Sequence, residues 1–441
     1  MMIQHRLCAM LVVMVLMLLP QPAAAASYNY IDISNPFLRK TPIAVPTFQT
    51  DGQDSTAAPV ARQASQLISY YLDFTGYFTI SDPGAFLENP QTMNITGSGI
   101  RYRNWTAIGA ELLVTGKVAV SDGDAEFELR LFDTVKEKML LGKRYRGAID
   151  DHQRVARRFC SEVVYTIFGS HGFFDSKLAF VSNGSGNKEI YLCDFDGRNI
   201  TPFTHHRSIS LFPDWSSDGS WIAYTTYAEK KPRIYIRHVR EKRIAKIRKP
   251  KLQMTPAWVP GSFELAASLS FSGDQEIYLL TGNGKVIKRL TNMEGIDVEP
   301  TWSPDGKRMA FVSRRSGNPQ IYIYDTVSGR VQRLTFEGRY NTQPSWSPSG
   351  DKIAYSAMRS GVLDIFAINP EGGEPTQLTE NQGSNEAPTW SPDGSLIAFG
   401  STREGKSRIY VMTAYGTDQR RLLTLPGEQT NPKWSPNILN P

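Results

Sequence analysis

The last two thirds of the chain alternates short apolar runs with short polar segments. Each apolar run holds a few strand-forming side chains and is followed by a polar turn and a second run such as 320–324, which is typical of buried strands joined in hairpins. Runs of the Ile-Ala-Phe type occur six times, at Leu178–Phe180, Ile222–Tyr224, Leu265–Ala267, Met309–Phe311, Ile353–Tyr355 and Ile397–Phe399. The pattern predicts an all-β region made of six similar units.

A Pro-x-Trp tripeptide repeats in step with these runs. Its tryptophans are Trp215, Trp258, Trp302, Trp346, Trp390 and Trp434, separated by 43 residues once and then by 44 residues four times. After each tryptophan comes a Ser-Pro-Asp-Gly-like turn, in which proline fixes φ and glycine accepts a positive φ. A period near 44 residues with four short strands per repeat predicts a six-bladed β-propeller.

The two ends of the repeat array are incomplete in complementary ways. The first apolar run, Leu178–Phe180, has no Pro-x-Trp strand before it, and Pro432–Trp434 has no apolar run after it. We therefore expect the C-terminal strand to pair with the first blade and close the ring. Such closure hides the open sheet edges that would otherwise invite aggregation.

The residues before the propeller follow a different pattern. Strands are expected at 43–46, 111–120, 125–132 and 140–145, with helices at 56–71 and 151–168. The first helix carries Ala61, Ala64, Leu67 and Ile68 on one face, and Asp150 or Asp151 is suited to cap the second. The sequence thus predicts an α/β domain over 27–170, followed by the propeller over 171–441.

The first 26 residues are typical of a secretory signal. His5 and Arg6 precede an apolar run from Leu7 to Leu19, and Ala24–Ala26 offers a cleavage site. The run is shorter than the roughly 20 residues needed to span a bilayer, and no other stretch qualifies. An uncleaved anchor is the alternative. Cys8 lies inside the run, which argues against a lipoprotein anchor, and the style of the signal favours a bacterial periplasm.

Charge and cysteine content add little to this picture. The formal net charge of +6 is small and spread along the chain, so it does not indicate a nucleic-acid partner. The exception is the segment 230–251, which is either a solvated outer hairpin of the second blade or a docking patch for an anionic partner or envelope polymer. After signal removal, Cys160 and Cys193 are the only cysteines, and two buried free thiols are favoured over a disulfide between them.

Short motifs within the repeat resemble sites of known chemistry. Gly400–Ser407 matches the phosphate-binding pattern Gly-x4-Gly-Lys-Ser, but a strand follows it where that pattern needs a helix, so it is read as a hairpin turn. No Gly-x-Ser-x-Gly pentapeptide of a serine hydrolase occurs. The Asp-Gly pairs beginning at Asp196, Asp218, Asp305 and Asp393 fall at hairpin turns, which favours turns over calcium sites. No cofactor or metal is predicted.

The assembled pattern resembles the TolB family, the periplasmic propeller proteins of the Tol-Pal system. The resemblance covers essentially the whole chain after the signal, and its most specific elements are the segment 169–180, the six repeats and the closing Asn431–Pro436. It implies a non-catalytic, monomeric scaffold without a membrane span that links TolA of the inner-membrane complex to the outer-membrane lipoprotein Pal. It also implies a role in outer-membrane integrity and invagination during cell division, with other envelope proteins as further partners.

The resemblance also assigns two binding regions. TolA would bind the first residues of the mature chain as an added strand, and Pal would bind one mouth of the central channel, where the innermost strands begin. The TolA segment corresponds to Tyr28, Asn29, Tyr30, Ile31, Asp32 and Ile33. The alternative is that this segment is a strand docked on its own domain, and the two states can exchange. The mouth corresponds to Thr255, Val298, Glu299, Thr342, Gln343, Glu386 and Asn431, which vary between blades while the following Pro and Trp do not.

Two other functions stay open at this stage. A hydrolase or lyase acting inside the channel would need convergent acid and base groups, such as Glu299 and Glu386 opposite an Arg or His. A small-ligand sensor would need aromatic side chains at the mouth, for which Phe212 is the candidate. The six tryptophans are expected to pack between blades and not to contact a ligand.

Overall fold

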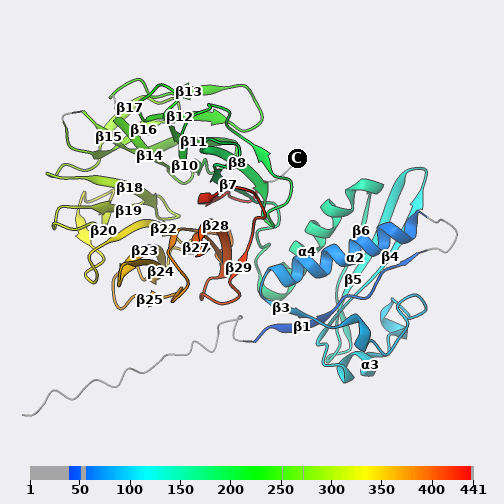
Figure 1. The fold of residues 1–441 in the computed structure, drawn as a ribbon. Helices are drawn as coiled ribbons and strands as arrows, with labels where there is room; N and C mark the ends of the chain where they lie inside the picture. The colour runs from blue at the N-terminus through cyan, green and yellow to red at the C-terminus, as the bar shows by residue number, and fades with distance from the viewer. Residues whose placement is uncertain (1–38, 51–55, 251, 272, 439–441) are drawn as a thin grey trace, which may run out of the picture. The chain divides into compact units, whose positions relative to one another are not determined.

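A computed structural model describes residues 39–50, 56–250, 252–271 and 273–438. These residues belong to one compact unit. They form an α/β domain followed by a six-bladed β-propeller, as the sequence predicts (Figure 1).

The α/β domain is built on one mixed sheet with strand order β3-β1-β4-β5-β6, in which β2 also pairs with β4. β1 runs parallel to β3 and β4, whereas β4, β5 and β6 form an antiparallel meander. The elements are β1 (Thr41–Ala44), β2 (Gln49–Thr50), α2 (Ala57–Phe74), β3 (Phe78–Ile80), α3 (Tyr102–Ala107), β4 (Leu112–Ser121), β5 (Asp124–Asp133), β6 (Lys138–Ala148) and α4 (His152–Phe168).

The long helix α2 forms where apolar residues recur at helical spacing in the sequence. α2 buries Ala61, Ala64 and Ile68 at helical spacing. The remaining apolar surface of the sheet is covered by the segment 82–107, whose Trp105 is almost fully buried. The sequence patterns did not indicate α3 or the short 3₁₀ turns at Pro83–Ala85 and Gly97–Gly99, because these pieces are too short to show a period.

The expected capping of α4 by an acidic side chain is wrong. A 3₁₀ turn at Ile149–Asp151 precedes the helix, so Asp151 already has helical backbone angles and its carboxylate makes no bond to the helix N-terminus. Instead it accepts from the Ala148 N–H at 3.2 Å and pairs with Arg154 at 2.6 Å. The strand expected at 140–145 is also longer, since the β5–β6 ladder extends it to Lys138–Ala148.

The propeller consists of six four-stranded antiparallel sheets, numbered here as blades 1 to 6. Blade 1 is β30-β7-β8-β9, and blades 2 to 6 take four consecutive strands each, from β10–β13 to β26–β29. The strands are β7 (Lys177–Ser182), β8 (Glu189–Asp194), β9 (Thr201–Pro202), β10 (Ser210–Trp215), β11 (Trp221–Thr226), β12 (Arg233–His238), β13 (Ile244–Lys246), β14 (Leu252–Trp258), β15 (Glu264–Ser270), β16 (Glu276–Thr281), β17 (Val286–Arg289), β18 (Asp297–Trp302), β19 (Arg308–Ser313), β20 (Gln320–Asp325), β21 (Val331–Arg333), β22 (Asn341–Trp346), β23 (Ile353–Arg359), β24 (Val362–Ile368), β25 (Thr376–Gln377), β26 (Asn385–Trp390), β27 (Leu396–Glu404), β28 (Lys406–Thr413), β29 (Arg420–Arg421) and β30 (Gln429–Trp434).

Ring closure occurs as predicted. The C-terminal strand β30 pairs antiparallel with β7, with Trp434 opposite Leu178. The Trp434 indole N–H donates to the Ser176 hydroxyl at 2.6 Å, and the Lys177 N–H donates to Ser435 Oγ at 2.8 Å. The first and last strands of the propeller therefore lie in one blade.

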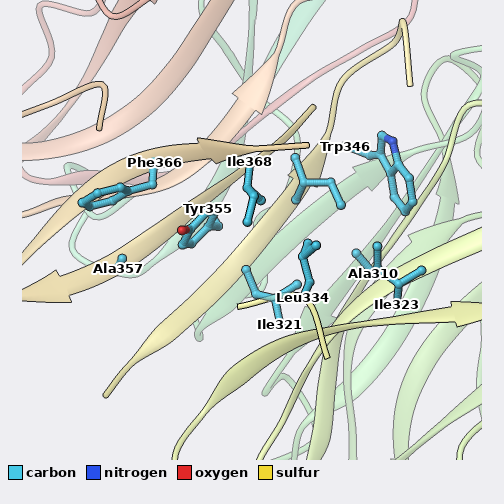
Figure 2. Packing of buried hydrophobic residues seen from close by; sticks show 10 residues of the cluster. Ala310, Ile321, Ile323, Leu334, Trp346, Tyr355, Ala357, Phe366 and Ile368 are labelled. Atoms are coloured by element: carbon cyan, nitrogen blue, oxygen red, sulfur yellow. The ribbon is translucent and has the colours of Figure 1, made fainter. Parts of the chain in front are cut away.

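The repeated tryptophans fill the seams between blades, as expected. Trp346 of blade 5 lies in a cluster with Ile321, Ile323 and Leu334 of blade 4 (Figure 2). The Trp390 indole N–H donates to a backbone carbonyl of the preceding blade, Ser345 O, at 3.1 Å. Buried aromatic rings thus seal the seams, and at Trp215, Trp302 and Trp390 the indole N–H also donates to a backbone carbonyl of the preceding blade.

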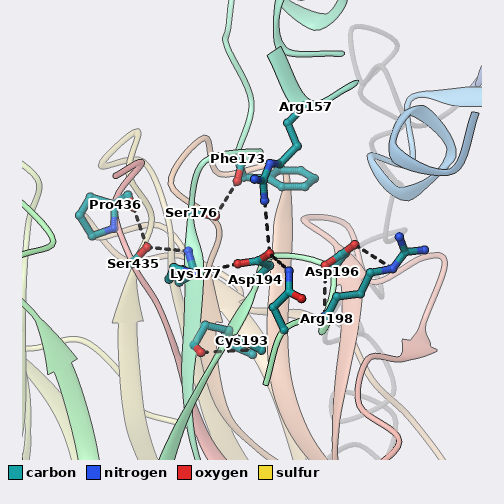
Figure 3. Close-up of polar contacts among 12 residues, drawn as sticks. Arg157, Phe173, Ser176, Lys177, Cys193, Asp194, Asp196, Arg198, Ser435 and Pro436 are labelled. Carbon is teal, nitrogen blue, oxygen red and sulfur yellow. Dashed lines mark hydrogen bonds and ion pairs between the residues drawn. The ribbon is translucent and has the colours of Figure 1, made fainter. Parts of the chain in front are cut away.

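A charged cluster lies where the chain enters the propeller. The Asp194 carboxylate accepts from Lys177 at 2.7 Å, from Asn199 at 2.8 Å and from Arg157 of α4 at 3.2 Å (Figure 3). Burial pushes the pKa of Asp194 upward, but these donors outweigh it and hold the pKa below its usual value. The protein's own side chains thus share this carboxylate, and their bonds tie α4 to β7 and β8.

Candidate functional site: the channel mouth

One end of the propeller channel forms a small cavity of about 110 Å³ where the inner strands begin. Each of the six inner strands contributes one residue to its wall, at the position immediately before the repeat proline. These six residues are Phe212, Thr255, Glu299, Gln343, Ala387 and Asn431. We call this end the channel mouth.

All six residues share one backbone conformation. Their φ angles lie between 48° and 55°, in the left-handed region, and the pairing of each inner strand with its neighbour shifts register at this point. Such a bulge turns one residue out of the normal alternation and re-aims its side chain. The bulge is what places the residue before proline at the mouth.

Hydrogen bonds connect consecutive blades around part of the mouth. The Glu299 N–H donates to Thr255 Oγ1 at 3.3 Å, the Gln343 N–H donates to Glu299 Oε2 at 2.7 Å, and the Ala387 N–H donates to Gln343 Oε1 at 2.9 Å. Each side chain thus holds the backbone of the next blade. The series stops at Ala387, which has no side-chain acceptor to offer Asn431.

Two carboxyl groups at this end have raised pKa values. Burial raises the pKa of Glu299, and Glu386 adds repulsion while the Gln343 N–H opposes the shift. Burial also raises the pKa of Glu386, against the attraction of Lys188. A carboxyl held in this way takes up a proton more readily than one in water.

One cation lines the mouth among the residues the structure describes. Lys433 Nζ pairs with Asp214 Oδ1 at 2.8 Å, and Asp214 Oδ2 accepts from the Trp258 N–H at 2.6 Å. The charges of Lys433 and Asp214 therefore largely cancel, and the Glu299 carboxylate is already engaged by a backbone N–H. The described lining thus resembles a polar docking rim more than an acid–base pair facing open space.

The structure brings four of the seven predicted mouth residues to the cavity wall: Thr255, Glu299, Gln343 and Asn431. Val298, Thr342 and Glu386 stand one position earlier on their strands and are not part of this lining. Phe212, Ala387 and Lys433 line the cavity but were absent from the predicted set. Counting strictly the residue before each repeat proline would have found the first two of these.

The opposite end of the channel is a second cavity of about 280 Å³. The six repeat tryptophans contribute to its lining, together with the prolines of the following turns. All six are at most 8% exposed, because most of each ring is packed between blades. This agrees with the predicted packing role.

The other motifs take the structures that their repeat positions predict. Gly400–Ser407 lies in the hairpin of β27 and β28, with a strand where a phosphate site needs a helix. Ser391 Oγ donates to Asp393 at 2.6 Å within a turn, and the turn at Asp305 is held in the same way. Within the described ranges, no group of three His, Cys, Asp or Glu side chains is placed to hold a metal ion.

Two further predictions concern the cysteines and the N-terminal segment. Cys160 and Cys193 are free and fully buried, as the favoured interpretation had it. Tyr28–Ile33 and the predicted signal lie outside the described residues. Among the helices that the structure does describe, none is long and apolar enough to span a membrane.

Comparison with known protein families matches both parts of the chain. A family described as the TolB amino-terminal domain matches residues 29–140, and one described as the TolB beta propeller domain matches residues 164–438. The second match alone covers more than half of the chain. The chain belongs to the TolB family.

Curated members of the TolB family support this assignment. The Tol-Pal system protein TolB of Desulfosudis oleivorans is 54% identical over 287 residues, which are 65% of each chain. A TolB homologue of Chlorobium chlorochromatii is 44% identical over 67% of this chain and 66% of its own length. The matched stretches therefore span about two thirds of these TolB relatives.

A solved TolB structure matches over a longer range. The crystal structure of TolB from Acinetobacter baumannii superimposes with a TM-score of 0.79 at 27% sequence identity. It covers 90% of this chain and 97% of that chain. The TolB fold thus extends across both the α/β domain and the propeller.

Proposed function

We propose that this protein is a non-catalytic periplasmic scaffold that binds Pal at the channel mouth and TolA through its N-terminal segment. It would thereby link the inner-membrane Tol complex to the outer membrane and support envelope integrity and invagination during division. The observation that carries the proposal is the TolB-family match, together with a mouth whose lining differs in every blade. The predicted signal over residues 1–26 supports a periplasmic location.

The surface around the mouth suits a protein partner. Loops that lead into the inner strands enter at the mouth end, and they carry exposed apolar side chains. These are Ile209, Met293, Ile296, Phe336 and Tyr340. Phe336 is 71% exposed. Exposed apolar groups around a polar centre are the composition expected of a protein-binding surface.

The proposed absence of catalysis rests on the contacts that already engage the charged groups of the mouth. Glu299 accepts a backbone hydrogen bond, and the Lys433 ammonium is paired with Asp214. An acid–base pair needs groups free to reach a substrate atom, and these are held by the protein's own backbone and side chains. A scaffold therefore fits the mouth better than the hydrolase or lyase alternative.

Calorimetric titration with the periplasmic domain of the organism's own Pal tests the mouth. Glu299→Lys, in the cavity wall, and Glu386→Lys, one position before the wall residue Ala387, are expected to weaken binding at least tenfold, since each replaces a half-buried acid with a cation. Glu374→Lys, a change at an exposed position in the turn between β24 and β25, at the opposite end of the propeller, is the matched control and should bind as wild type does. Equal binding by all variants, or no binding by folded wild type, would refute the proposal.

A second titration tests the N-terminal segment. Deleting residues 28–33 should abolish binding of the TolA periplasmic domain, because main-chain pairing would supply most of the affinity. Pal titrated against the same deletion variant shows whether the propeller is intact. Undiminished TolA binding would remove this segment from the proposal and leave the mouth assignment standing.

A further inference from the structure

A polar cavity of about 510 Å³ lies on the outer flank of blade 2, at the two strands of that sheet that are farthest from the channel. It is formed by β12 and the outermost strand β13, with Asn283 of blade 3 contributing to the wall. Three basic side chains line it, Arg233, Lys246 and Arg248, against one carboxylate, Glu229. Nothing in the scaffold function described above uses this cavity.

The basic groups of the cavity are only partly neutralised. Arg233 donates through Nη1 to Pro250 O at 2.7 Å, but its buried Nε has no hydrogen-bond acceptor and lies 3.9 Å from Glu229 Oε2. Lys246 Nζ pairs with Glu229 at 3.1 Å and lies over the Tyr235 ring. One carboxylate therefore serves two cations, and a buried N–H donor is left without an acceptor, which favours an added anion.

The surface around the cavity is strongly basic. The segment 229–250 carries ten Lys and Arg residues and two Glu residues, a formal charge of +8 in a chain whose total is +6. The rest of the protein is thus slightly acidic at −2. In blade 3, the outermost strand β17 and the turn before it add exposed Lys285 and Lys288. Charge this concentrated raises the local concentration of anions and steers them to the flank.

Apolar side chains are interspersed with these charges. Ile244 on β13 is 49% exposed, and Ile287 on β17 is 45% exposed. Phe263, in the turn between β14 and β15, is also exposed. Basic residues next to exposed aliphatic and aromatic groups are typical of proteins that rest on a lipid interface, where the charges meet headgroups and the apolar groups enter the acyl boundary. A soluble acidic peptide would not require the apolar groups.

We propose that the outer flank of blades 2 and 3 is a docking surface for an anionic lipid bilayer, with a phosphate headgroup entering the cavity between Arg233, Lys246 and Arg248. This is independent of the partners assigned to the channel mouth. In addition to its protein partners, the protein would thus contact a membrane directly and reversibly. Electrostatic attraction to the headgroups and shallow insertion of apolar side chains would hold it there.

The test is co-sedimentation of the exported, processed protein with vesicles. Vesicles of phosphatidylcholine alone are compared with vesicles holding 30% phosphatidylglycerol. Wild type should bind only the anionic vesicles, and binding should weaken with added salt because the attraction is screened. Lys246→Glu with Arg248→Glu should weaken the partition about 25-fold or more, since each basic residue near an anionic surface contributes roughly fivefold.

Matched variants make the outcome specific. Lys307→Glu with Arg330→Glu reverses two exposed charges in blade 4 and should bind as wild type does. Ile244→Ser keeps the charges and should weaken binding by a smaller factor. An unchanged melting temperature shows that each variant is folded. All variants share the same N-terminus, so any contribution of that segment cancels.

Three results would overturn the proposal. Equal partition of the flank and blade 4 variants would mean that net charge alone is responsible. A second such result would be that millimolar inorganic phosphate displaces the wild-type protein from vesicles and that the wild-type protein also binds phosphate in the absence of vesicles. The cavity would then be an ion site and not part of a docking surface. Tighter binding of a glutamate-rich peptide than of anionic vesicles would assign the flank to an acidic protein partner.

Discussion

At the scale of single residues, the mouth combines strained backbone angles with backbone N–H groups that donate to side chains of the preceding blade. Six non-glycine residues adopt left-handed φ angles, a conformation that costs roughly 1–2 kcal/mol for most side chains. Thr255 is the least suited of them because its β-branch crowds the backbone there. Hydrogen bonds between blades offset part of this cost, and the result is a rim of fixed geometry.

Thr255→Asn is expected to stabilise the protein by about 1 kcal/mol, because asparagine tolerates the left-handed region and keeps an acceptor for the Glu299 N–H. Urea denaturation measures the free energy of unfolding. Thr301→Asn, on the inner strand of the next blade, is the control, since Thr301 does not adopt a left-handed φ angle. Equal effects at both positions would show that strain at Thr255 is unimportant.

The pKa of Glu299 predicts a pH-dependent stability. Folding raises this pKa above its ordinary value of 4.5, so the folded state holds the proton more tightly than the unfolded state. The bound proton of Glu299 therefore stabilises the folded state fully below about pH 4.5. This contribution to the free energy of unfolding is lost as the pH rises through the pKa of Glu299 in the folded state. Glu299→Gln, which keeps an acceptor for Gln343, should lose less stability than wild type between pH 4.5 and 7.5. Parallel urea midpoints across that range would contradict this.

At the scale of elements, the repeat made the propeller strands predictable because each carries the same buried positions in every blade. The mouth was only half predictable, since a bulge at the residue before proline breaks the alternation from which facing residues are counted. Outer strands such as β25, with two residues, give no periodic signal. Asp151 was misassigned because a 3₁₀ turn, invisible in the sequence, displaced the helix start.

The seam between blades is the element whose loss should cost most. Trp346→Ala removes a ring packed against both blade 4 and blade 5, and should lower the free energy of unfolding by about 3–5 kcal/mol. Trp221→Ala is a useful comparison, because this half-buried tryptophan lies outside the repeated seam position and should cost less. Chemical denaturation of the two variants measures the difference.

At the scale of the whole molecule, the ring is held together by one strand from the far end of the chain. Deleting residues 429–441 removes β30, exposes the edge of β7 and takes away the carbonyl of Lys433 that accepts from the Trp215 indole at 3.1 Å. We expect the truncated protein to melt at a lower temperature and to associate through its open edges. Light scattering and thermal denaturation test this, and a monomer with unchanged melting would contradict it.

The closure of blade 1 also determines how the protein would bear mechanical load. Tension applied through the N-terminal side reaches the propeller at Lys177, the first residue of β7, and β7 is hydrogen-bonded to β30 on one side and β8 on the other. A strand held along both edges cannot peel away one bond at a time, so several bonds must break together. A scaffold that carries load through this strand would therefore yield by rupture at a threshold force. β8 and β30 would keep their pairing with β7 until that force is reached.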